Sequence, residues 1–342
     1  MASRRYLVPL LLVPLTAAAA LWLFAWPVAR AAPRGLPVGV SGPQAAVVSL
    51  EGRLAVAHGS TSFAFHRYDG ERSARHAIAD RDVYGAVVMS PAGTTLLTAS
   101  AASPAVANLL QQAAAGPAAG HPAQVRVVDV VPLPATDPRG IAFTSSLLPL
   151  LVAGIACAHL APSLAPTLGR RVGVLLGAAV LTGLAATALA QSWLAYLGGN
   201  WAADAGVVAL ITLAVSSLVS GLAALGRTAG LLAGAMLMVL IGNATSGATT
   251  APELLPTAIG WIGRLLPPGA GAGALRGTAF FDGHGIGRDI TVLAVWIVLG
   301  LLMTVLGARR AQRSGHPHGA HALGAFAEPA AGGTPAAAVS TD

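Results

Sequence analysis

The residues of this chain that could carry a function are concentrated in one proline-rich segment, residues 246–289. Prolines at this spacing interrupt helices, because each lacks the N–H that an interior helical position needs. A carboxylate follows the first proline, and an arginine precedes the last apolar stretch. We expect a structural or gating motif here, without a catalytic role, formed by Pro252, Glu253, Pro256, Pro267, Pro268 and Arg276.

Elsewhere, no set of side chains has the spacing of a catalytic or metal-binding site. Four histidines are scattered through one stretch without ligand spacing: His58, His66, His76 and His121. The chain contains no lysine, which excludes the lysine-containing phosphate loop of many ATPases. Cys157 is the sole cysteine, so no disulfide can form within the chain. The sequence therefore predicts no enzyme, no cofactor and no metal site.

Six apolar stretches, each near the roughly 20 residues that a helix needs to cross a bilayer, dominate the rest of the sequence. They contain no Asp, Glu or Arg, and they cover residues 6–28, 142–161, 172–193, 205–225, 229–245 and 290–307. Overall, 55% of the residues are hydrophobic and 10% are charged, against about 25% charged in soluble domains. We predict a polytopic α-helical membrane protein with six transmembrane helices.

The arginines between these stretches predict the orientation. The clusters stand before the first span, in every second connection between spans and after the last span, so all four fall on one side of a six-span chain: Arg4 and Arg5, Arg170 and Arg171, Arg227, and Arg309, Arg310 and Arg313. Because basic residues are retained in the cytoplasm, both termini should lie there, in a multi-pass protein of the plasma membrane. The net charge of +7 is then explained by orientation in a lipid bilayer, and we expect no nucleic-acid partner.

The first apolar stretch, within residues 1–30, has two interpretations. Its length favours an uncleaved signal anchor. The alternative is a cleaved secretory signal, because Val28-Ala29-Arg30-Ala31 loosely fits a cleavage site between small residues.

Residues 31–140 predict a small α/β domain on the outer face of the membrane, between the first and second spans. Short apolar runs indicate strands at 36–40, 62–66, 84–89, 94–98 and 125–131, and helical periodicity indicates helices at 72–82 and 104–115. Ser103 followed by Pro104 is typical of a helix start. The Pro/Gly-rich residues 116–122 indicate a loop.

Residues 141–308 predict a five-helix transmembrane bundle, followed by a disordered cytoplasmic tail at 309–342, which is rich in Ala, Pro and Gly. Two pairs of glycines four residues apart, Gly173/Gly177 and Gly230/Gly234, are expected to let helices pack closely. His159 is the only ionisable side chain in the predicted bundle spans, which disfavours a self-contained ion-coupled transporter.

Between the fifth and sixth spans, the segment 246–289 would form an outer hairpin at the membrane surface. Trp261, Phe280 and Phe281 are expected at headgroup depth, with Arg264 and Arg276 reaching outward.

This segment resembles the corresponding region of type-2 ATP-binding-cassette permeases and of the related phage-infection-protein-like membrane proteins. Both show a small or polar turn, a Pro-x-x-x-Leu-Pro-like element, a second Leu-Pro and an Arg before the final span. Here those features are Ser246-Gly247, the run from Pro252 to Pro256, Leu266-Pro267 and Arg276. One span, an outer domain and five further spans also match the layout of that superfamily over residues 1–310.

The resemblance implies the permease subunit of an exporter that works with a separate cytoplasmic ATPase, as a homo- or heterodimer. One departure is that such permeases contact the ATPase through an elbow before the first span and a helix between the second and third. Here those places offer five and about ten residues, respectively. The alternative is a non-transporting envelope protein whose outer domain binds a partner or surface ligand.

Overall fold

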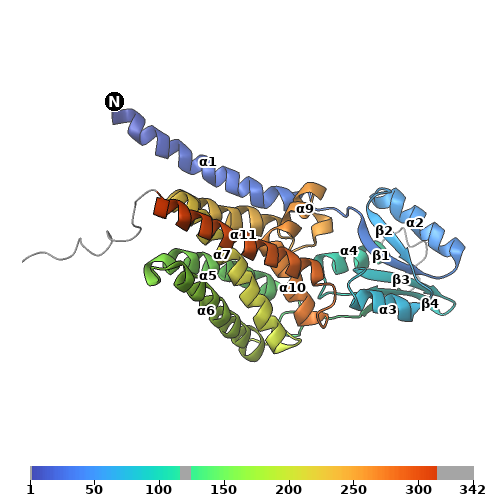
Figure 1. The fold of residues 1–342 in the computed structure, drawn as a ribbon. Helices are drawn as coiled ribbons and strands as arrows, with labels where there is room; N and C mark the ends of the chain where they lie inside the picture. The colour runs from blue at the N-terminus through green and yellow to red at the C-terminus, as the bar shows by residue number, and fades with distance from the viewer. Residues whose placement is uncertain (1, 116–124, 314–342) are drawn as a thin grey trace, which may run out of the picture.

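The computed structural model describes residues 2–115 and 125–313 and shows a helical bundle with an α/β unit at one end. In Figure 1 the long helix α1 (Ala2–Ala29) extends beside the bundle, and the chain then enters the α/β unit before returning to the bundle. The structure is thus mostly helical, and its order of elements follows the predicted one.

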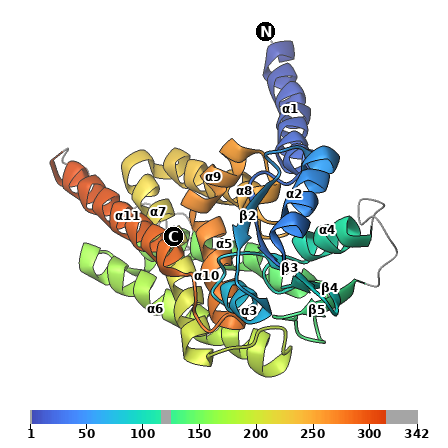
Figure 2. The same ribbon diagram turned by 90° about the vertical axis from the view of Figure 1, so that its right-hand side faces the viewer.

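The α/β unit, hereafter the sheet domain, is one five-stranded sheet in the order β2-β1-β3-β4-β5, in which only β3 and β4 pair antiparallel. Its elements are β1 (Leu36–Ser41), α2 (Gln44–His58), β2 (Phe63–Arg67), α3 (Glu71–Ala79), β3 (Gly85–Ser90), β4 (Gly93–Thr98), α4 (Pro104–Ala115) and β5 (Arg126–Asp129). Helix α3 packs on one face through Ile78, and α2 and α4 pack on the other through Leu54 and Leu110. Figure 2 shows the domain from this end of the molecule.

All five strands and the two predicted helices occur near the expected positions, but the sequence did not predict α2. Only Val47 and Leu54 of that helix are buried, so its apolar periodicity is too weak to be read from the sequence. The predicted cap is present, since the Ser103 hydroxyl accepts a hydrogen bond from Val106 N at 3.3 Å. The loop predicted at 116–122 lies outside the described residues.

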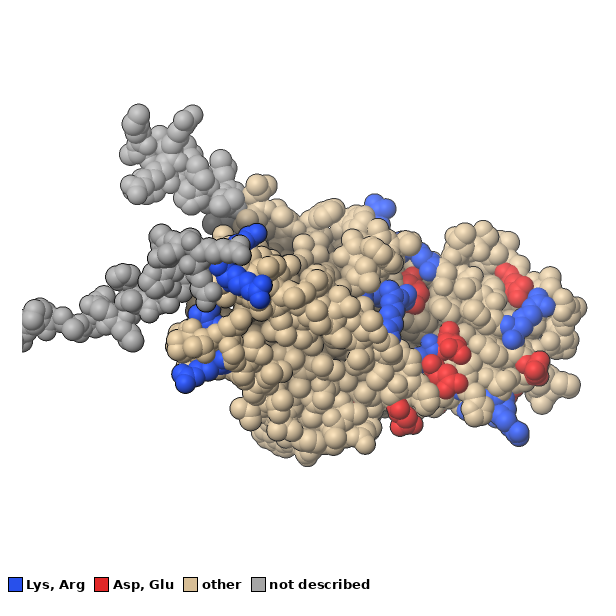
Figure 3. Space-filling view, viewed as in Figure 1, with Lys and Arg blue, Asp and Glu red and all other residues tan. Residues whose placement is uncertain are grey.

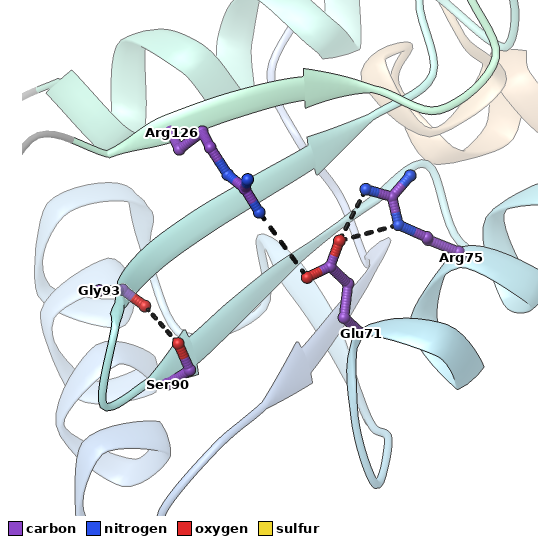
Figure 4. A network of polar contacts seen from close by, with 5 residues as sticks. All are labelled: Glu71, Arg75, Ser90, Gly93 and Arg126. Atoms are coloured by element: carbon purple, nitrogen blue, oxygen red, sulfur yellow. Dashed lines mark hydrogen bonds and ion pairs between the residues drawn. The ribbon is translucent and has the colours of Figure 1, made fainter.

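Glu71 connects α3 to β5 at the surface of the sheet domain (Figure 4). Its Oε1 accepts hydrogen bonds from Arg75 Nε at 2.9 Å and Nη2 at 2.6 Å, and its Oε2 lies 3.9 Å from Arg126 Nη2. In the same view the hydroxyl of Ser90 donates to Gly93 O across the β3–β4 turn. Exposed ion pairs of this kind contribute about 0–1 kcal/mol, so Arg126 is a suitable control position below.

Four helices of the described chain are long and apolar enough to cross a membrane: Ile141–Leu164, Leu168–Trp193, Trp201–Thr245 and Gly287–Arg310. They comprise α5 (Ile141–Leu164), α6 (Leu168–Thr187) with its π-helical end η2 (Ala188–Trp193), α7 (Trp201–Met236) continued by η3 (Leu237–Gly242) and α8 (Asn243–Thr245), and α11 (Gly287–Arg313). These helices form the bundle.

The longest of these helices reverses direction at Arg227, whose φ of 53° and ψ of −133° are not helical. A Cβ on Gly234 would lie 3.2 Å from the Cα of Val219, which is possible only if the second part folds back on the first. This break falls between the two apolar stretches predicted at 205–225 and 229–245.

Two boundaries differ from the prediction. Helix α11 continues to Arg313, so residues 309–313 are not part of a disordered tail; Ala, Arg and Gln there favour helix. Residues 314–342 lie outside the described residues.

The second boundary is at the start of α7. Asp204 is fully buried in the first turn of that helix, where the helix N-terminus favours an acidic side chain. The bundle therefore holds an ionisable residue that the predicted span boundary had placed just outside it.

Of the two predicted glycine pairs, one packs closely and one does not. A Cβ on Gly230 would lie 1.9 Å from Leu222 O, whereas Cβ atoms on Gly173 and Gly177 would meet nothing within 4 Å. The prediction was therefore right for the second pair and wrong for the first, which faces away from the other described helices.

Charged residues are unevenly placed over the surface. On the face shown in Figure 3, basic side chains gather at the end of the bundle remote from the sheet domain, and residues of both signs lie at the sheet-domain end. A band without charged side chains separates the two ends in this view.

Candidate functional site

The proline-rich residues 246–286, hereafter the outer segment, form three short helices between α8 and α11. These are η4 (Pro252–Leu254), α9 (Thr257–Leu265) and α10 (Pro267–Phe280). A proline starts η4 and α10 and another directly precedes α9, because proline fits the first helical position but not the interior. The helix breaks predicted at these prolines are confirmed.

The outer segment packs into both the sheet domain and the bundle. Leu254 joins the sheet-domain core around Leu36, and Phe281 joins the opposite core around Ile78. Leu275 of α10 lies in the core of the bundle with Ile211. The segment is therefore the structural junction between the two units.

This packing corrects the expectation that the outer aromatic residues sit at headgroup depth. Phe281 is 3% exposed, within the sheet-domain core, and Phe280 is partly buried with its ring 5.8 Å from that of Phe143. Trp261 alone of the three is largely exposed, at 61%. Burial against a folded domain removes more apolar surface from water than an interfacial position does, which explains the placement.

Glu253 links the outer segment to the sheet domain by polar contacts. The hydroxyl of Tyr84 donates a hydrogen bond to Glu253 Oε2 at 2.7 Å, and Arg264 pairs with Glu253 Oε1. Burial, and next the adjacent carboxylate, raise the pKa of Tyr84, so the phenol remains a hydrogen-bond donor at neutral pH.

Arg276 lies at the centre of the junction, 8% exposed. Its Nη2 donates to Ala248 O at 3.0 Å, and its Cζ lies 4.9 Å from the centre of the Phe143 ring. Removal from water lowers the pKa of Arg276 to about 10, which leaves the guanidinium cationic at neutral pH. The expectation that Arg276 reaches outward is wrong, because the sheet domain covers it.

Arg81 reaches the outer segment from the opposite side. It follows α3 with a φ of 67°, a conformation that costs a non-glycine residue about 1 kcal/mol or more. Its Nη1 donates to Gly273 O at 3.1 Å and to His284 O at 3.4 Å, and its Cζ lies 5.6 Å from the Phe281 ring centre. These contacts hold the guanidinium across the junction.

These side chains line a cavity of about 310 Å³ between the sheet domain and the bundle, which we call the junction cavity. Its charged lining residues are Arg81, Asp82, Glu253, Arg264, Arg276, Arg288 and Asp289. A cavity of this size with several convergent polar groups has the character of a small-molecule site.

The structure brings together three of the six predicted residues: Pro252, Glu253 and Arg276 line the junction cavity. The other three shape the segment. Pro256 directly precedes α9, and Pro267 and Pro268 are buried at the start of α10.

Sequence reasoning missed the partners that the sheet domain and α11 contribute. Tyr84 lies 169 residues before its partner Glu253, and Arg81 lies 192 residues before its partner Gly273. Nothing in the local sequence distinguishes either residue. The adjacent charges Arg288 and Asp289, placed directly before an apolar run, were a signal that could have been noticed.

The Glu253 contacts predict a measurable contribution to stability. Glu253→Gln leaves Arg264 without its carboxylate, and we expect the free energy of unfolding to fall by about 2 kcal/mol, as for hydrogen bonds to charged groups. Glu51→Gln, which loses a contact of 3.5 Å to the exposed Arg67, should cost no more than about 0.5 kcal/mol. Denaturant titration in non-ionic detergent measures both, and equal losses would contradict the assignment.

Comparison of the chain with models of known families, with curated proteins and with solved structures finds no match in any of the three.

Proposed function

We propose that this chain is a six-span protein of the plasma membrane with both termini in the cytoplasm and the sheet domain outside. The reversal at Arg227 supports two antiparallel spans within residues 201–245. Helix α1 would supply the remaining span, as an uncleaved anchor. The basic end remote from the sheet domain, visible in Figure 3, fits a cytoplasmic surface.

Cysteine labelling tests this orientation. In a Cys157→Ala background, we expect an impermeant thiol reagent to label Ala92→Cys on intact cells and to label Thr167→Cys only after lysis. Both positions are exposed, in the β3–β4 turn and in the α5–α6 connection. Labelling of Thr167→Cys on intact cells would contradict the proposed orientation.

For function, we propose a permease subunit of an exporter, acting as a dimer with a separate cytoplasmic ATPase. The observation that carries this proposal is the insertion of the outer segment into the cores of both the sheet domain and the bundle. Any rearrangement of the bundle helices would then change the shape of the junction cavity. An exporter with an outer domain needs such coupling between its membrane helices and that domain. The sequence resemblance to type-2 ATP-binding-cassette permeases supports the same conclusion.

The surface available to an ATPase is small. Helix α5 ends at Leu164 and α6 begins at Leu168, so only three residues, 165–167, connect them. Thr167 is exposed there, and Arg171 Nε donates to Ala165 O at 3.0 Å, which holds the connection in place. An ATPase would therefore bind a rigid turn.

Purification of the tagged full chain from native membranes in mild detergent tests the proposal. We expect a nucleotide-binding subunit to co-purify with ATP hydrolysis, and we expect Thr167→Glu to abolish both. Ala92→Glu, an equally exposed change in the outer turn, should abolish neither. A chain that purifies without ATP hydrolysis above the background of membranes lacking it would overturn the exporter proposal.

The second candidate is a non-transporting envelope protein that binds a ligand outside the membrane. The three-residue α5–α6 connection favours it, because it leaves no room there for the helix through which the permeases contact their ATPase. The purification experiment separates the two candidates.

A further inference from the structure

Arg276 lines both the junction cavity and a second cavity of about 170 Å³, which we call the arginine cavity. The second cavity lies where the sheet domain meets the start of α5, with lining residues Ala101 and Pro104 on one side and Phe143 and Thr144 on the other. Arg139, Thr249 and Phe280 also line it. Two arginines line the arginine cavity: Arg276, which belongs to the outer segment, and Arg139, which lies in the connection that leads into α5.

Arg276 forms no ion pair with another described residue, and the carboxylate of Asp289, which lines the junction cavity with it, acts on its charge only from a greater distance. No carboxylate among the described residues lies within 4.0 Å of its guanidinium or of that of Arg139. A guanidinium carries five N–H donors, and Arg276 makes one hydrogen bond, to Ala248 O. A buried cation without an anionic partner costs several kcal/mol.

The two cavities differ in the charges of their lining. The junction cavity holds acidic residues as well as arginines, whereas the described residues that line the arginine cavity include Arg139 and Arg276 and no acid. We propose that the arginine cavity binds an oxyanion, a phosphate or carboxylate group, between the guanidinium groups of Arg139 and Arg276. Charge-assisted hydrogen bonds to such a group would satisfy the donors that the protein leaves free.

The size and place of the cavity limit the ligand. A volume of about 170 Å³ is below the range of about 300–1,000 Å³ typical of sites for drug-sized molecules, so it suits a small anion or a headgroup. In the proposed orientation the start of α5 lies at the outer membrane surface, where phospholipid phosphates are found. The oxyanion therefore has two sources, a free anion or a phospholipid, and the site does not depend on an ATPase partner.

Inorganic phosphate tests the first source. The test is the thermal unfolding of the purified full chain in non-ionic detergent, with phosphate replacing chloride at constant ionic strength. Wild type and Arg126→Gln should be stabilised at the same phosphate concentrations, whereas Arg139→Gln should need at least about tenfold more phosphate, the effect of losing one charge-assisted contact. Arg139 and Arg126 are both exposed, so neither change should prevent folding. Arg276→Lys, which keeps the charge, should give an intermediate response.

Native mass spectrometry from nanodiscs of phosphatidylglycerol and phosphatidylcholine tests the second source. A phospholipid retained by wild type and Arg126→Gln but lost from Arg139→Gln assigns the site to lipid, and a phosphate response without retained lipid assigns it to a free anion. Either result supports the oxyanion site. Equal phosphate responses in wild type and Arg139→Gln, together with lipid retention that does not depend on Arg139, would overturn it.

Discussion

Phe281→Ala should lower the free energy of unfolding of the sheet domain by about 3–5 kcal/mol, the cost of removing a large aromatic side chain from a core. The ring is 3% exposed and belongs to the core cluster that contains Ala74 and Ile78 of α3 and Val83 of the α3–β3 connection. Its loss would leave a cavity in this core. We therefore expect the sheet domain to loosen from the outer segment.

Hydrogen–deuterium exchange of the full chain in detergent measures this effect by region. Amides of α3 and of residues 277–286 should exchange faster in Phe281→Ala, while those of α7 and α11 should keep their protection. Trp261→Ala removes a larger aromatic side chain from the same outer segment at a position that is 61% exposed, and it should cost no more than about 0.5 kcal/mol. Unchanged exchange in α3 would show that Phe281 is not part of that core.

Gly300→Ala should separate α11 from α7 and cost about 3 kcal/mol, the upper part of the usual range for overpacking. A Cβ at position 300 would lie 2.3 Å from the carbonyl carbon of Ser217 and 2.5 Å from Leu218 N. These are backbone atoms, which no side-chain rotation can move aside. A Cβ at Gly221 would in turn lie 2.5 Å from Gly300 O, so the two helices touch backbone to backbone.

Gly173→Ala is the matched control, because a Cβ there would meet nothing within 4 Å in the described structure. Alanine is favoured over glycine inside a helix by about 1 kcal/mol, so this variant should be as stable as wild type or slightly more stable. The stabilities of the two variants are compared by the helical circular dichroism that each retains during titration with a denaturing detergent. If both lose stability equally, the close contact of α7 with α11 is not the cause.

The sequence alone was sufficient for features that depend on local chemistry. The apolar runs became helices, and the strands at 36–41 and 85–90 appeared where short apolar runs were bounded by turns. The breaks around Pro252 and Pro267 also followed from the sequence, since proline lacks an N–H donor whatever surrounds it. The reversal at Arg227 lies where the sequence has an arginine between two apolar stretches.

Only the tertiary structure decided which of these residues meet. The sequence pointed to Glu253 and Arg276 but not to Tyr84 or Arg81. The contacts of Tyr84 and Arg81 with the outer segment join residues 169 and 192 positions apart in the chain. Phe281 is as apolar in sequence as a lipid-facing residue, and only the docked sheet domain makes it a core residue. Similarly, Gly173 and Gly300 are equally small, but helix packing gives just one of them a neighbouring backbone. Hydropathy and proline act within a few residues, whereas burial and charge pairing depend on which surfaces the folded chain brings into contact.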